Sequence, residues 1–375
     1  MSSSAEEAPG QGLVIGSSRV VLSRVATLLL IAVALLTLLV VTLSTVLAVT
    51  GFPVRPALAA LWEGSFGSWY VFGSATLVRA TPLILTGLAV TLAFRAGIWN
   101  IGAEGQLLVG AACVAAAAVH VPALHPLLAL PLLTAIGGLA GATWAGIAAL
   151  LRRGFGVLEV ISTIMLNFIA AHLVGYLVRG PLQEPLGIYP QSAELPGAFR
   201  IPALASGTRL TWALPLAITV ACVLWLFLTR SAWGFRVRAI GANPVAAEVA
   251  GEISVPVSTF RIFLWSGAIA GIAGALEIMG VTSSLYENLS PGYGYTAIAV
   301  AMLARLHPLV VVASAILFGS LEAGAASMQR TAGVPSVVVW IVEAVLLLAV
   351  LLAGRVRGGQ LETWLGRTFR QSSAV

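Results

Sequence analysis

The sequence predicts an all-α, polytopic membrane protein, and three observations support this fold class. Of the 375 residues, 59% are hydrophobic and only 9% are charged, with a mean hydropathy of +1.00, whereas soluble domains carry about 25% charged residues. Apolar runs near the length of about 20 residues that crosses a bilayer as a helix recur along the chain. Arginines gather at the ends of these runs, as the positive-inside rule expects.

The composition also excludes several classes of function. All 20 basic residues are Arg, so the chain cannot contain a P-loop, which needs a Lys on the nucleotide phosphates. The formal charge of +6 does not indicate nucleic-acid binding, because the Arg residues lie singly or in pairs beside apolar runs. Cys113 and Cys222 lie inside apolar runs, which favours small buried side chains over a disulfide or a metal site. The four His residues show no metal-ligand spacing.

The first apolar run covers 25–49 and follows a polar, Ser-rich segment, 1–24, that we expect to be a cytoplasmic tail. The run exceeds the about 7–15 residues of a signal-peptide core and has no clear cleavage site, so we interpret it as a spanning helix. Further spans are predicted at 71–94, 104–119, 127–151, 157–178, 211–229, 259–280, 295–305, 308–327 and 335–354. The membrane domain is therefore 25–354, and 355–375 form a second cytoplasmic tail.

These segments make about ten spans, but 295–305 is too short to cross a bilayer alone. An alternative is eight or nine full crossings with this segment as a re-entrant piece. A chain with ten crossings has both ends on the same side of the membrane.

The distribution of Arg residues orients the chain. With the N-terminus inside and ten crossings, thirteen Arg residues fall inside, five fall outside, and Arg79 and Arg261 lie within or at the edge of spans. The inside set is 19, 24, 95, 152, 153, 230, 236, 238, 305, 355, 357, 367 and 370. Both termini and the loop 230–258 are therefore predicted to be cytoplasmic, and the Pro- and Gly-rich loop 180–210 is predicted to be external.

The cytoplasmic loop contains a stretch with clear signals for the start and the end of a helix, WGFRVRAIGANPVAAEVAGEIS at 233–254. Asn243 can cap a helix, Pro244 suits the first helical position, and Gly251 can end the helix. A helix of about two turns is unstable alone in water, so it must be docked. Arg236 and Arg238 just before it mark the cytoplasmic side of the membrane. We interpret this loop as the coupling segment that another subunit binds in order to move the membrane domain.

A second informative stretch, FRAGIWNIGAEGQ at 94–106, joins two apolar runs almost without a gap. Its three Gly residues make it a poor helix, and broken backbone at membrane depth is tolerated only where it is buried or lines a wet cavity. The stretch is therefore either a tight cytoplasmic turn or a broken helix near a pathway. A further possibility is helix capping by Asn100, with Glu104 near the positive helix end.

Other polar residues lie inside predicted spans. Glu159 and Asn167 are eight residues apart, about two helical turns, so they can share one face. Glu277, Glu322 and Glu343 lie in later spans. Ionisable groups inside a membrane are expensive and usually face the bundle interior, so transport and helix–helix hydrogen bonding are both open. Glu159 can also lie at the membrane interface, because it begins its span.

Small residues recur at helix-packing spacing. Gly137 and Gly141, Gly267 and Gly271, and Ser320 and Gly324 are separated by four positions. In lipid such pairs allow close helix contact. Chance is the alternative in a chain with 39 Gly.

Four blocks of the sequence resemble a known family: GIWNIGAEGQ, EVISTIMLNFIA, GANPVAAEVAG and GYGYTAIAVAMLARLHPL. Together they resemble the permease subunits of bacterial ABC importers for simple sugars and nucleosides. The nearest resemblance is to general nucleoside importers whose binding partner is a basic-membrane-protein-type lipoprotein. The third block is shared with the wider ribose-permease branch and resembles its coupling helix. The matching blocks run from about residue 75 to 350, so the resemblance covers most of the chain.

The resemblance implies a BtuC-like, type II importer body, two ABC ATPase subunits, a second related permease and an external substrate-binding lipoprotein. ATP and Mg²⁺ would be bound by the partner ATPase, and no cofactor is expected in this chain. By this resemblance, the residues that would fit a groove on the ATPase are Asn243, Pro244, Ala246, Ala247 and Gly251. The full set of predicted coupling residues adds Arg236, Arg238 and Glu248. Glu252 departs from the family pattern, in which an apolar residue usually follows the Gly.

We therefore expect a permease that passes a nucleoside or a simple sugar inward across the inner membrane, with membrane lipid around it, no nucleic-acid partner and no catalytic residue. The predicted pathway or gate residues are Asn100, Glu104, Gln106, Glu159 and Asn167. One rival interpretation is an ion-driven secondary transporter that uses a carboxylate such as Glu104 or Glu277 as a proton site. A passive channel and a structural membrane anchor are two further possibilities.

Overall fold

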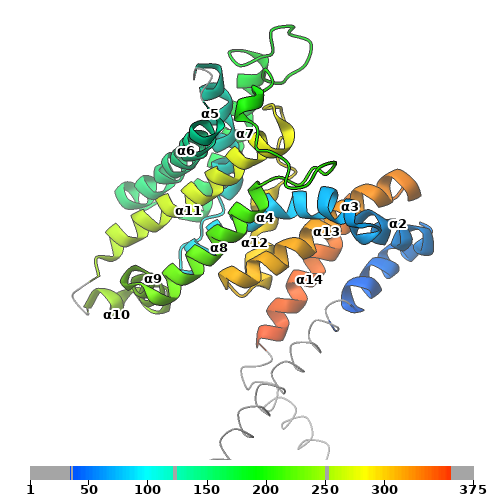
Figure 1. Ribbon diagram of the computed structural model, residues 1–375. Coiled ribbons are helices and arrows are strands. Elements are labelled where there is room, and N and C mark those ends of the chain that lie inside the picture. Colours follow the sequence, from blue (N-terminus) through cyan, green and yellow to red (C-terminus); the bar gives the residue numbers. More distant parts are fainter. Residues whose placement is uncertain (1–33, 35–36, 121–124, 250–252, 356–375) are drawn as a thin grey trace, which may run out of the picture. The chain divides into compact units, whose positions relative to one another are not determined.

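The computed structural model describes residue 34 and residues 37–120, 125–249 and 253–355. It divides into two compact units, one of residues 55–336 and one of the described residues within 1–54 and 337–375. In the smaller unit, an apolar helix covers Thr37–Val49 and α14 covers Val337–Arg355 (Figure 1). Apart from Arg355, the two predicted tails lie outside the described residues.

The larger unit consists of helices joined mostly by short segments, with one long connection, 180–212, between α7 and α8; this connection contributes to all three isolated β-bridges. Its α-helices are α2 (Val54–Phe66), α3 (Trp69–Val71), α4 (Val78–Arg95), α5 (Ala103–His120), α6 (Pro126–Phe155), α7 (Glu159–Arg179), α8 (Ala213–Arg230), α9 (Ala232–Ala242), α10 (Pro244–Val249), α11 (Val255–Glu277), α12 (Tyr293–Leu303) and α13 (Pro308–Ala332). The π-helical segment η1 (Phe72–Leu77) leads into α4, η3 (Ile278–Thr282) follows α11, and the 3-10 turn η2 covers Gly197–Phe199.

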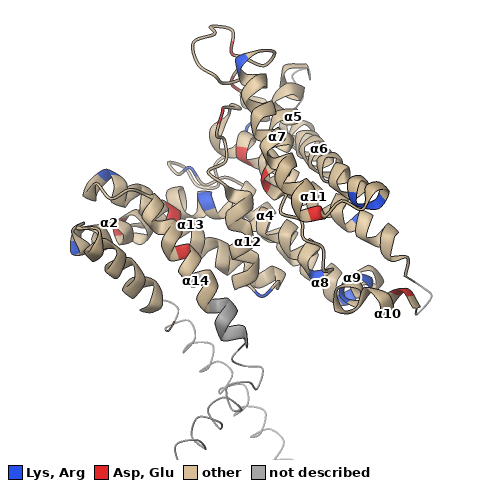
Figure 2. Cartoon of the chain, turned by 180° about the vertical axis from the view of Figure 1, so that it is seen from behind, with Lys and Arg blue, Asp and Glu red and all other residues tan. Residues whose placement is uncertain are grey.

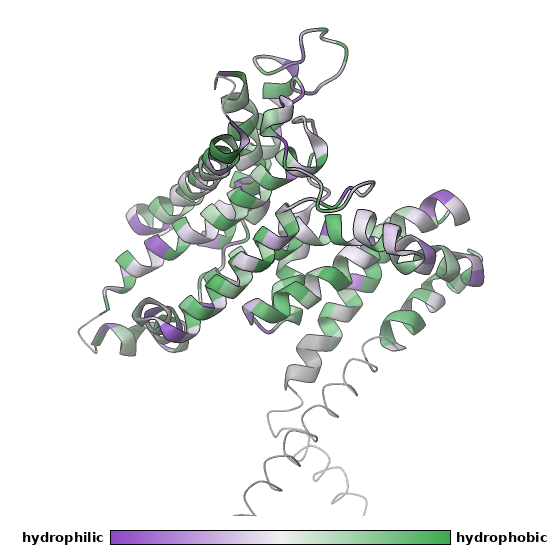
Figure 3. Ribbon diagram, in the orientation of Figure 1, coloured by the Kyte–Doolittle hydropathy of each residue, from purple (hydrophilic) through white to green (hydrophobic). Residues whose placement is uncertain are grey.

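Seven helices among the described residues are long and apolar enough to cross a membrane, and apolar residues dominate them in Figure 3. They are Trp69–Arg95, Ala103–His120, Pro126–Phe155, Glu159–Arg179, Ala213–Arg230, Val255–Thr282 and Pro308–Ala332. Each matches a predicted span, with ends that differ by a few residues. The segment predicted to be too short to cross alone is α12, with 11 residues. The prediction of an all-α, polytopic membrane protein is confirmed.

The central helix of the larger unit is α4, which packs against α8, α11, α12 and α13. In the apolar window of Trp69–Arg95, 83% of the residues are buried inside the protein. A helix that is hydrophobic all round belongs in a core rather than at a surface. The segment after α4 therefore starts from the end of a buried helix, although Gly97 and Trp99 in that segment are exposed.

Small residues allow α11 to pack closely on α6, as their spacing predicts. A Cβ added to Gly271 would lie 2.2 Å from the Gly137 carbonyl oxygen, and one added to Gly141 would lie 2.3 Å from the Gly267 carbonyl oxygen. Any larger side chain at these positions would separate the two backbones. The GxxxG prediction is therefore confirmed for both pairs.

The helix α2 was not predicted from the sequence. It packs on α13, where the Ser65 hydroxyl donates a hydrogen bond to the Ser320 carbonyl oxygen over 2.6 Å. A Cβ added to Gly324 would lie 2.6 Å from the Ser65 oxygen, so the predicted small-residue pair does make a close contact. Arg55 and Glu63 interrupt the apolar pattern of α2, and for that reason no span was recognised there.

The interpretation of both cysteines as small buried residues is wrong for Cys222. Cys113 on α5 is half-buried, whereas Cys222 on α8 is exposed, and both are free thiols. Lipid tails are as apolar as a protein core, so a lipid-facing side of a helix has the same composition as a packed side. An apolar run therefore does not show which of its residues are buried.

Candidate functional site

The loop 230–258 forms a pair of helices, α9 and α10. Asn243 separates them, and its Oδ1 accepts a hydrogen bond from the Ala246 N–H over 3.1 Å, as an N-cap does. Pro244 is the first residue of α10. The predicted start of this helix is therefore confirmed. Gly251, which was predicted to end it, lies outside the described residues.

Most predicted coupling residues are exposed on α9 and α10, and Figure 2 marks basic residues on α9 and an acidic residue on α10. The exposed residues are Arg236, Arg238, Asn243, Pro244, Ala246 and Glu248. Ala247 differs, because it is only 6% exposed and packs with Ile240 of α9 and with Ile253. Its side chain holds α10 onto α9, so it is not available to a groove on another subunit in this structure.

The end of α9 rests directly on the end of α4. A Cβ added to Gly241 would lie 1.9 Å from the Arg95 carbonyl oxygen and 3.2 Å from the Ala96 Cα. Gly97, which has a φ of 72°, also faces the Gly241 Cα. Only glycine permits this approach of two backbones, so the α9–α10 loop is in contact with the point where α4 ends.

The stretch after α4 is a broken helix. Between Arg95 and Ala103 the chain has no helical residue, and Gly97 turns it with a left-handed φ that favours glycine. Ile98 and Asn100 are then buried, at 2% and 0% exposed. The backbone of this segment has lost helical hydrogen bonds inside the protein, and buried polar backbone groups need other partners.

Two amides provide some of these partners. The side chains of Asn100 and Gln106 donate hydrogen bonds to each other over 3.2 and 3.0 Å, and the Asn100 Oδ1 also accepts the Gly102 N–H over 2.9 Å. Asn100 Nδ2 donates to the Ser266 hydroxyl of α11 over 2.8 Å, and that hydroxyl donates to the Ala89 carbonyl oxygen of α4. The first turn of α5 is thereby fixed to α4 and α11.

Asn167 of α7 closes the other side of the break. Its Oδ1 accepts the Gly105 N–H and its Nδ2 donates to the Ile101 carbonyl oxygen, each over 2.9 Å. Nδ2 also lies 3.3 Å from the Tyr295 hydroxyl of α12. A single side chain thus satisfies both the donor and the acceptor of the one backbone hydrogen bond, Gly105 N–H to Ile101 C=O, that an unbroken helix would have made.

Glu104 connects the same site to the start of α12. Its Oε2 accepts a hydrogen bond from the Gly294 N–H over 2.7 Å. A Cβ added to Gly294 would lie 2.1 Å from the Glu104 nitrogen, so glycine is required for this contact. We call the four side chains of Asn100, Glu104, Gln106 and Asn167 the break network.

The depth of the break network decides between a turn at the end of two helices and a break within the bundle. α7 begins at Glu159, and Asn167 is eight residues further on, about 12 Å at 1.5 Å per residue. α5 therefore starts about two turns inside the bundle rather than at its end. The structure favours the broken helix. Asn100 accepts the N–H of Gly102, which precedes the first residue of α5, so it makes a turn before the helix rather than the expected cap.

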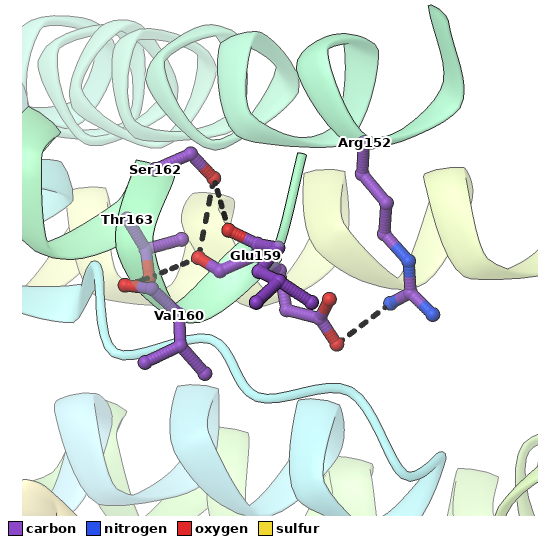
Figure 4. A network of polar contacts seen from close by, with 6 residues as sticks. Arg152, Glu159, Val160, Ser162 and Thr163 are labelled. Atoms are coloured by element: carbon purple, nitrogen blue, oxygen red, sulfur yellow. Dashed lines mark hydrogen bonds and ion pairs between the residues drawn. The ribbon is translucent and has the colours of Figure 1, made fainter. Parts of the chain in front are cut away.

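Glu159 does not belong to the break network. Its carboxylate accepts a hydrogen bond from Arg152 over 2.9 Å, and its carbonyl oxygen accepts hydrogen bonds from the hydroxyls of Ser162 and Thr163 (Figure 4). It joins the end of α6 to the first turn of α7, where an acidic side chain is favoured by the helix dipole. The structure brings together four of the five predicted gate residues and separates this one.

The break network cannot contact a solute in this structure. Asn100, Gln106, Asn167 and Glu104 are 0%, 1%, 2% and 6% exposed, and every one is hydrogen-bonded. Sequence reasoning missed Ser266, Gly294 and Gly241, which support the site from other elements. A supporting role for the two glycines could have been suspected, because they lie in the sequence blocks that carry the family resemblance. A single Ser inside an apolar span gives no such indication.

Comparison with known proteins identifies the family. Residues 73–353 match the family described as "Branched-chain amino acid transport system / permease component". The guanosine ABC transporter permease protein NupP of Bacillus subtilis is 40% identical over 82% of this chain and 88% of that protein. The glucose ABC transporter permease protein TsgB13 of Haloferax volcanii is 38% identical over 80% and 86%. The nucleoside ABC transporter permease protein NupB of Lactococcus lactis is 31% identical over 72% and 77%.

A second permease with the same substrate name also matches the chain in all three of these organisms: NupQ in B. subtilis at 28% identity, NupC in L. lactis at 27%, and the putative TsgC13 in H. volcanii at 30%. No solved structure matches the chain. The relatives are permease proteins of ABC transporters, so the prediction of a transport subunit rather than an enzyme is confirmed. This chain is a multi-pass membrane protein and belongs to the permease family of ABC transporters that carries the description above.

Proposed function

We propose that this chain is the transmembrane permease of a bacterial ABC importer that carries a nucleoside or a simple sugar into the cell. The observation that carries the proposal is the similarity, over most of both chains, to permeases named for guanosine and for glucose. Both solutes are small, uncharged and rich in hydroxyl groups. The solute would be selected outside the cell by a binding lipoprotein and delivered to this subunit.

We propose a BtuC-like, type II body with ten crossings of the inner membrane and both termini in the cytoplasm. The seven candidate spans and the three shorter apolar helices, Thr37–Val49, Tyr293–Leu303 and Val337–Ala349, support that number. The excess of Arg on one side supports the orientation. The exposed surface of α9 and α10 would then face the cytoplasm.

We propose that ABC ATPase subunits bind α10 and that a second, related permease completes the transporter. ATP and Mg²⁺ would be held by the ATPase, in agreement with the lack of Lys in this chain. The exposed residues Pro244, Val245, Ala246 and Val249 give α10 a small, mostly apolar surface for docking. The two permeases of one substrate name in B. subtilis and in L. lactis support a pair of different chains.

The proposed mechanism is conformational. Movement of α10 by the ATPase would be passed through Ala247 to α9, and from Gly241 to the backbone of Arg95 and Ala96. That contact adjoins the segment that enters the break network. Because side chains rather than helical hydrogen bonds hold the backbone there, the break between α4 and α5 is suited to act as a hinge.

Transport by the reconstituted complex tests the proposal. The chain, its neighbouring permease, the ATPase and the binding lipoprotein are placed in vesicles, and uptake of labelled guanosine and of labelled glucose is measured with and without ATP. We expect uptake of one of them that depends on ATP and on the lipoprotein. Uptake driven by a proton gradient without the ATPase would instead support an ion-driven transporter, and equilibration without either would support a passive channel.

A further inference from the structure

Four charged side chains lie together at the end of the bundle opposite α9 and α10. Glu277 ends α11, which begins next to α10 and is 23 residues long, about 33 Å at 1.5 Å per residue. Arg79 lies at the start of α4, Glu322 on α13, and Arg209 just before α8. The positive charges of Arg209 and Arg79 and the negative charge of Glu322 all act on the Glu277 carboxylate. We call these four side chains the charged cluster.

The charged cluster is not neutralised by direct contacts. Among the described residues, the ion pairs are Arg152–Glu159, Arg179–Glu287 and Arg200–Glu194, none of which includes a member. Glu277 is 6% exposed, and its carboxylate makes no hydrogen bond within the described chain. Removing a carboxylate from water is expensive unless hydrogen bonds or an ion pair replace the water. Its capacity to accept hydrogen bonds is therefore unfilled.

Unusual backbone adjoins the charged cluster on two elements. The described residues contain two π-helical segments, η1 and η3. One ends two residues before Arg79, and the other begins directly after Glu277. Short π-helical segments inside α-helices occur frequently at functional sites. Their position here is an observation independent of the charges.

A small cavity and a covering loop complete the site. Glu277 lines a cavity of about 10 Å³ together with Thr81 of α4 and Thr211, which is room for about one water molecule. The loop that follows α7 covers it: Ile201 N–H donates to the Met279 carbonyl oxygen of η3 over 2.8 Å. The Glu277 carboxylate is therefore enclosed in this conformation, whereas Arg209 is exposed and Arg79 and Glu322 are half-buried. Access to Glu277 requires movement of that loop or of η3.

We propose that the charged cluster is a solute-contact site at the outer half of the permease, for an uncharged, hydroxyl-rich solute such as the sugar ring of a nucleoside or a monosaccharide. Carboxylate oxygens of Glu277 and Glu322 accept hydrogen bonds from sugar hydroxyls, and the guanidinium groups of Arg79 and Arg209 donate to oxygen atoms of the solute. The inference rests on the proposed function, because it names where that solute is held.

The test uses the complete transporter in vesicles, with labelled guanosine as the probe, or glucose if guanosine is not carried. Uptake and ATP hydrolysis are measured in the same vesicles for the wild type and for Glu277→Gln. We expect uptake per ATP hydrolysed to fall about tenfold, the size of one lost charged hydrogen bond. The preference for guanosine over 2′,3′-dideoxyguanosine, or for glucose over 2-deoxyglucose, should weaken as well. The binding lipoprotein is the same in both samples, so a changed preference arises in the permease.

Glu63→Gln is the matched control, because Glu63 is an exposed carboxylate on α2 outside the charged cluster, and it should leave both ratios unchanged. If the Glu277→Gln complex does not assemble, Glu322→Gln decides by the same ratios. The inference would be overturned if uptake per ATP hydrolysed and the solute preference were unchanged. It would also be overturned if uptake and ATP hydrolysis fell in parallel with the solute preference unchanged. In both cases the proposed importer function would remain supported. A wild-type complex that transports neither solute with ATP would overturn the proposed function and this inference with it.

Discussion

The break network and the Glu277 carboxylate of the charged cluster are both polar and buried among apolar helices, but they differ in how far their hydrogen-bonding capacity is filled. In the break network, neutral amides and one carboxylate meet specific backbone and side-chain partners at 2.7–3.3 Å. In the charged cluster, the Glu277 carboxylate has the attracting charges of Arg79 and Arg209 and the repelling charge of Glu322 around it, but no hydrogen bond within the described chain. A filled network maintains a conformation, whereas an unfilled one can bind something else.

The largest effect on transport is expected from a substitution in the α9–α10 loop. Ala247→Arg would place a long charged side chain where Ala247 now packs on Ile240 and Ile253, and α10 could not stay against α9. We expect uptake to be abolished, a fall of about 100-fold or more, while the protein still inserts into the membrane. Ala232→Arg, at an exposed position on the first turn of α9, is the control. Normal uptake by Ala247→Arg would remove the coupling assignment of α10.

The contact between the loop and the broken helix is broken by Gly241→Ala. The new Cβ would lie 1.9 Å from the Arg95 carbonyl oxygen, so α9 must move away from α4. We expect uptake to fall by about tenfold, since small misplacements of a working part have effects of this size, while ATP hydrolysis by the complex persists.

Gly154→Ala is the control for that variant, because a Cβ at Gly154 meets nothing within 4 Å. If Gly241→Ala transports as much solute per ATP as the wild type, movement is not passed through this contact.

Asn167→Leu removes the hydrogen bonds that the Asn167 side chain makes in the break network. It leaves the Gly105 N–H and the Ile101 carbonyl oxygen without their partners, and each buried unsatisfied group costs about 1–3 kcal/mol. We expect the free energy of unfolding in detergent to fall by about 2–5 kcal/mol. Phe168→Leu, on an exposed part of the same helix, should change it little. Equal stability of the two variants would contradict the structural role given to Asn167.

The smallest expected effect is on stability, and it is found by making the same Glu→Gln substitution in the break network and in the charged cluster. Glu104→Gln weakens the hydrogen bond from the Gly294 N–H, and we expect a loss of about 1–2 kcal/mol in unfolding free energy. Glu277→Gln removes a carboxylate that has no hydrogen bond to lose, so we expect no loss of stability despite the change in transport. Thermal unfolding of both variants in the same detergent checks the difference. A larger loss for Glu277→Gln than for Glu104→Gln would reverse the comparison.

The sequence predicts the spans and the start of α10 because local properties determine them. Long apolar runs identify membrane helices by composition, and Asn243 followed by Pro244 has a cap geometry that needs no distant partner. The two-turn spacing of Glu159 and Asn167 predicts that they can share one helix face, and both do lie on α7. It could not show that Arg152, on the preceding helix, would pair with Glu159 and leave Asn167 to the break network.

Long-range contacts account for what the sequence could not show. Gly241 and Arg95 are far apart in the chain, and nothing local to either predicts that their backbones touch. The exposure of Cys222 and the burial of Ala247 likewise depend on which neighbouring elements pack against them. The composition of a helix is nearly the same on its lipid-facing and packed sides, so in this protein burial has to be seen in the structure.

The central claim, that this permease works through partners bound at α10 and outside the cell, is tested most directly by isolating the tagged chain from its native membrane in mild detergent. Mass spectrometry identifies what remains bound. We predict an ABC ATPase, a second related permease and a substrate-binding lipoprotein. If the chain is reproducibly isolated alone while it remains folded, the account of α10 is contradicted and an ion-driven or passive transporter takes its place.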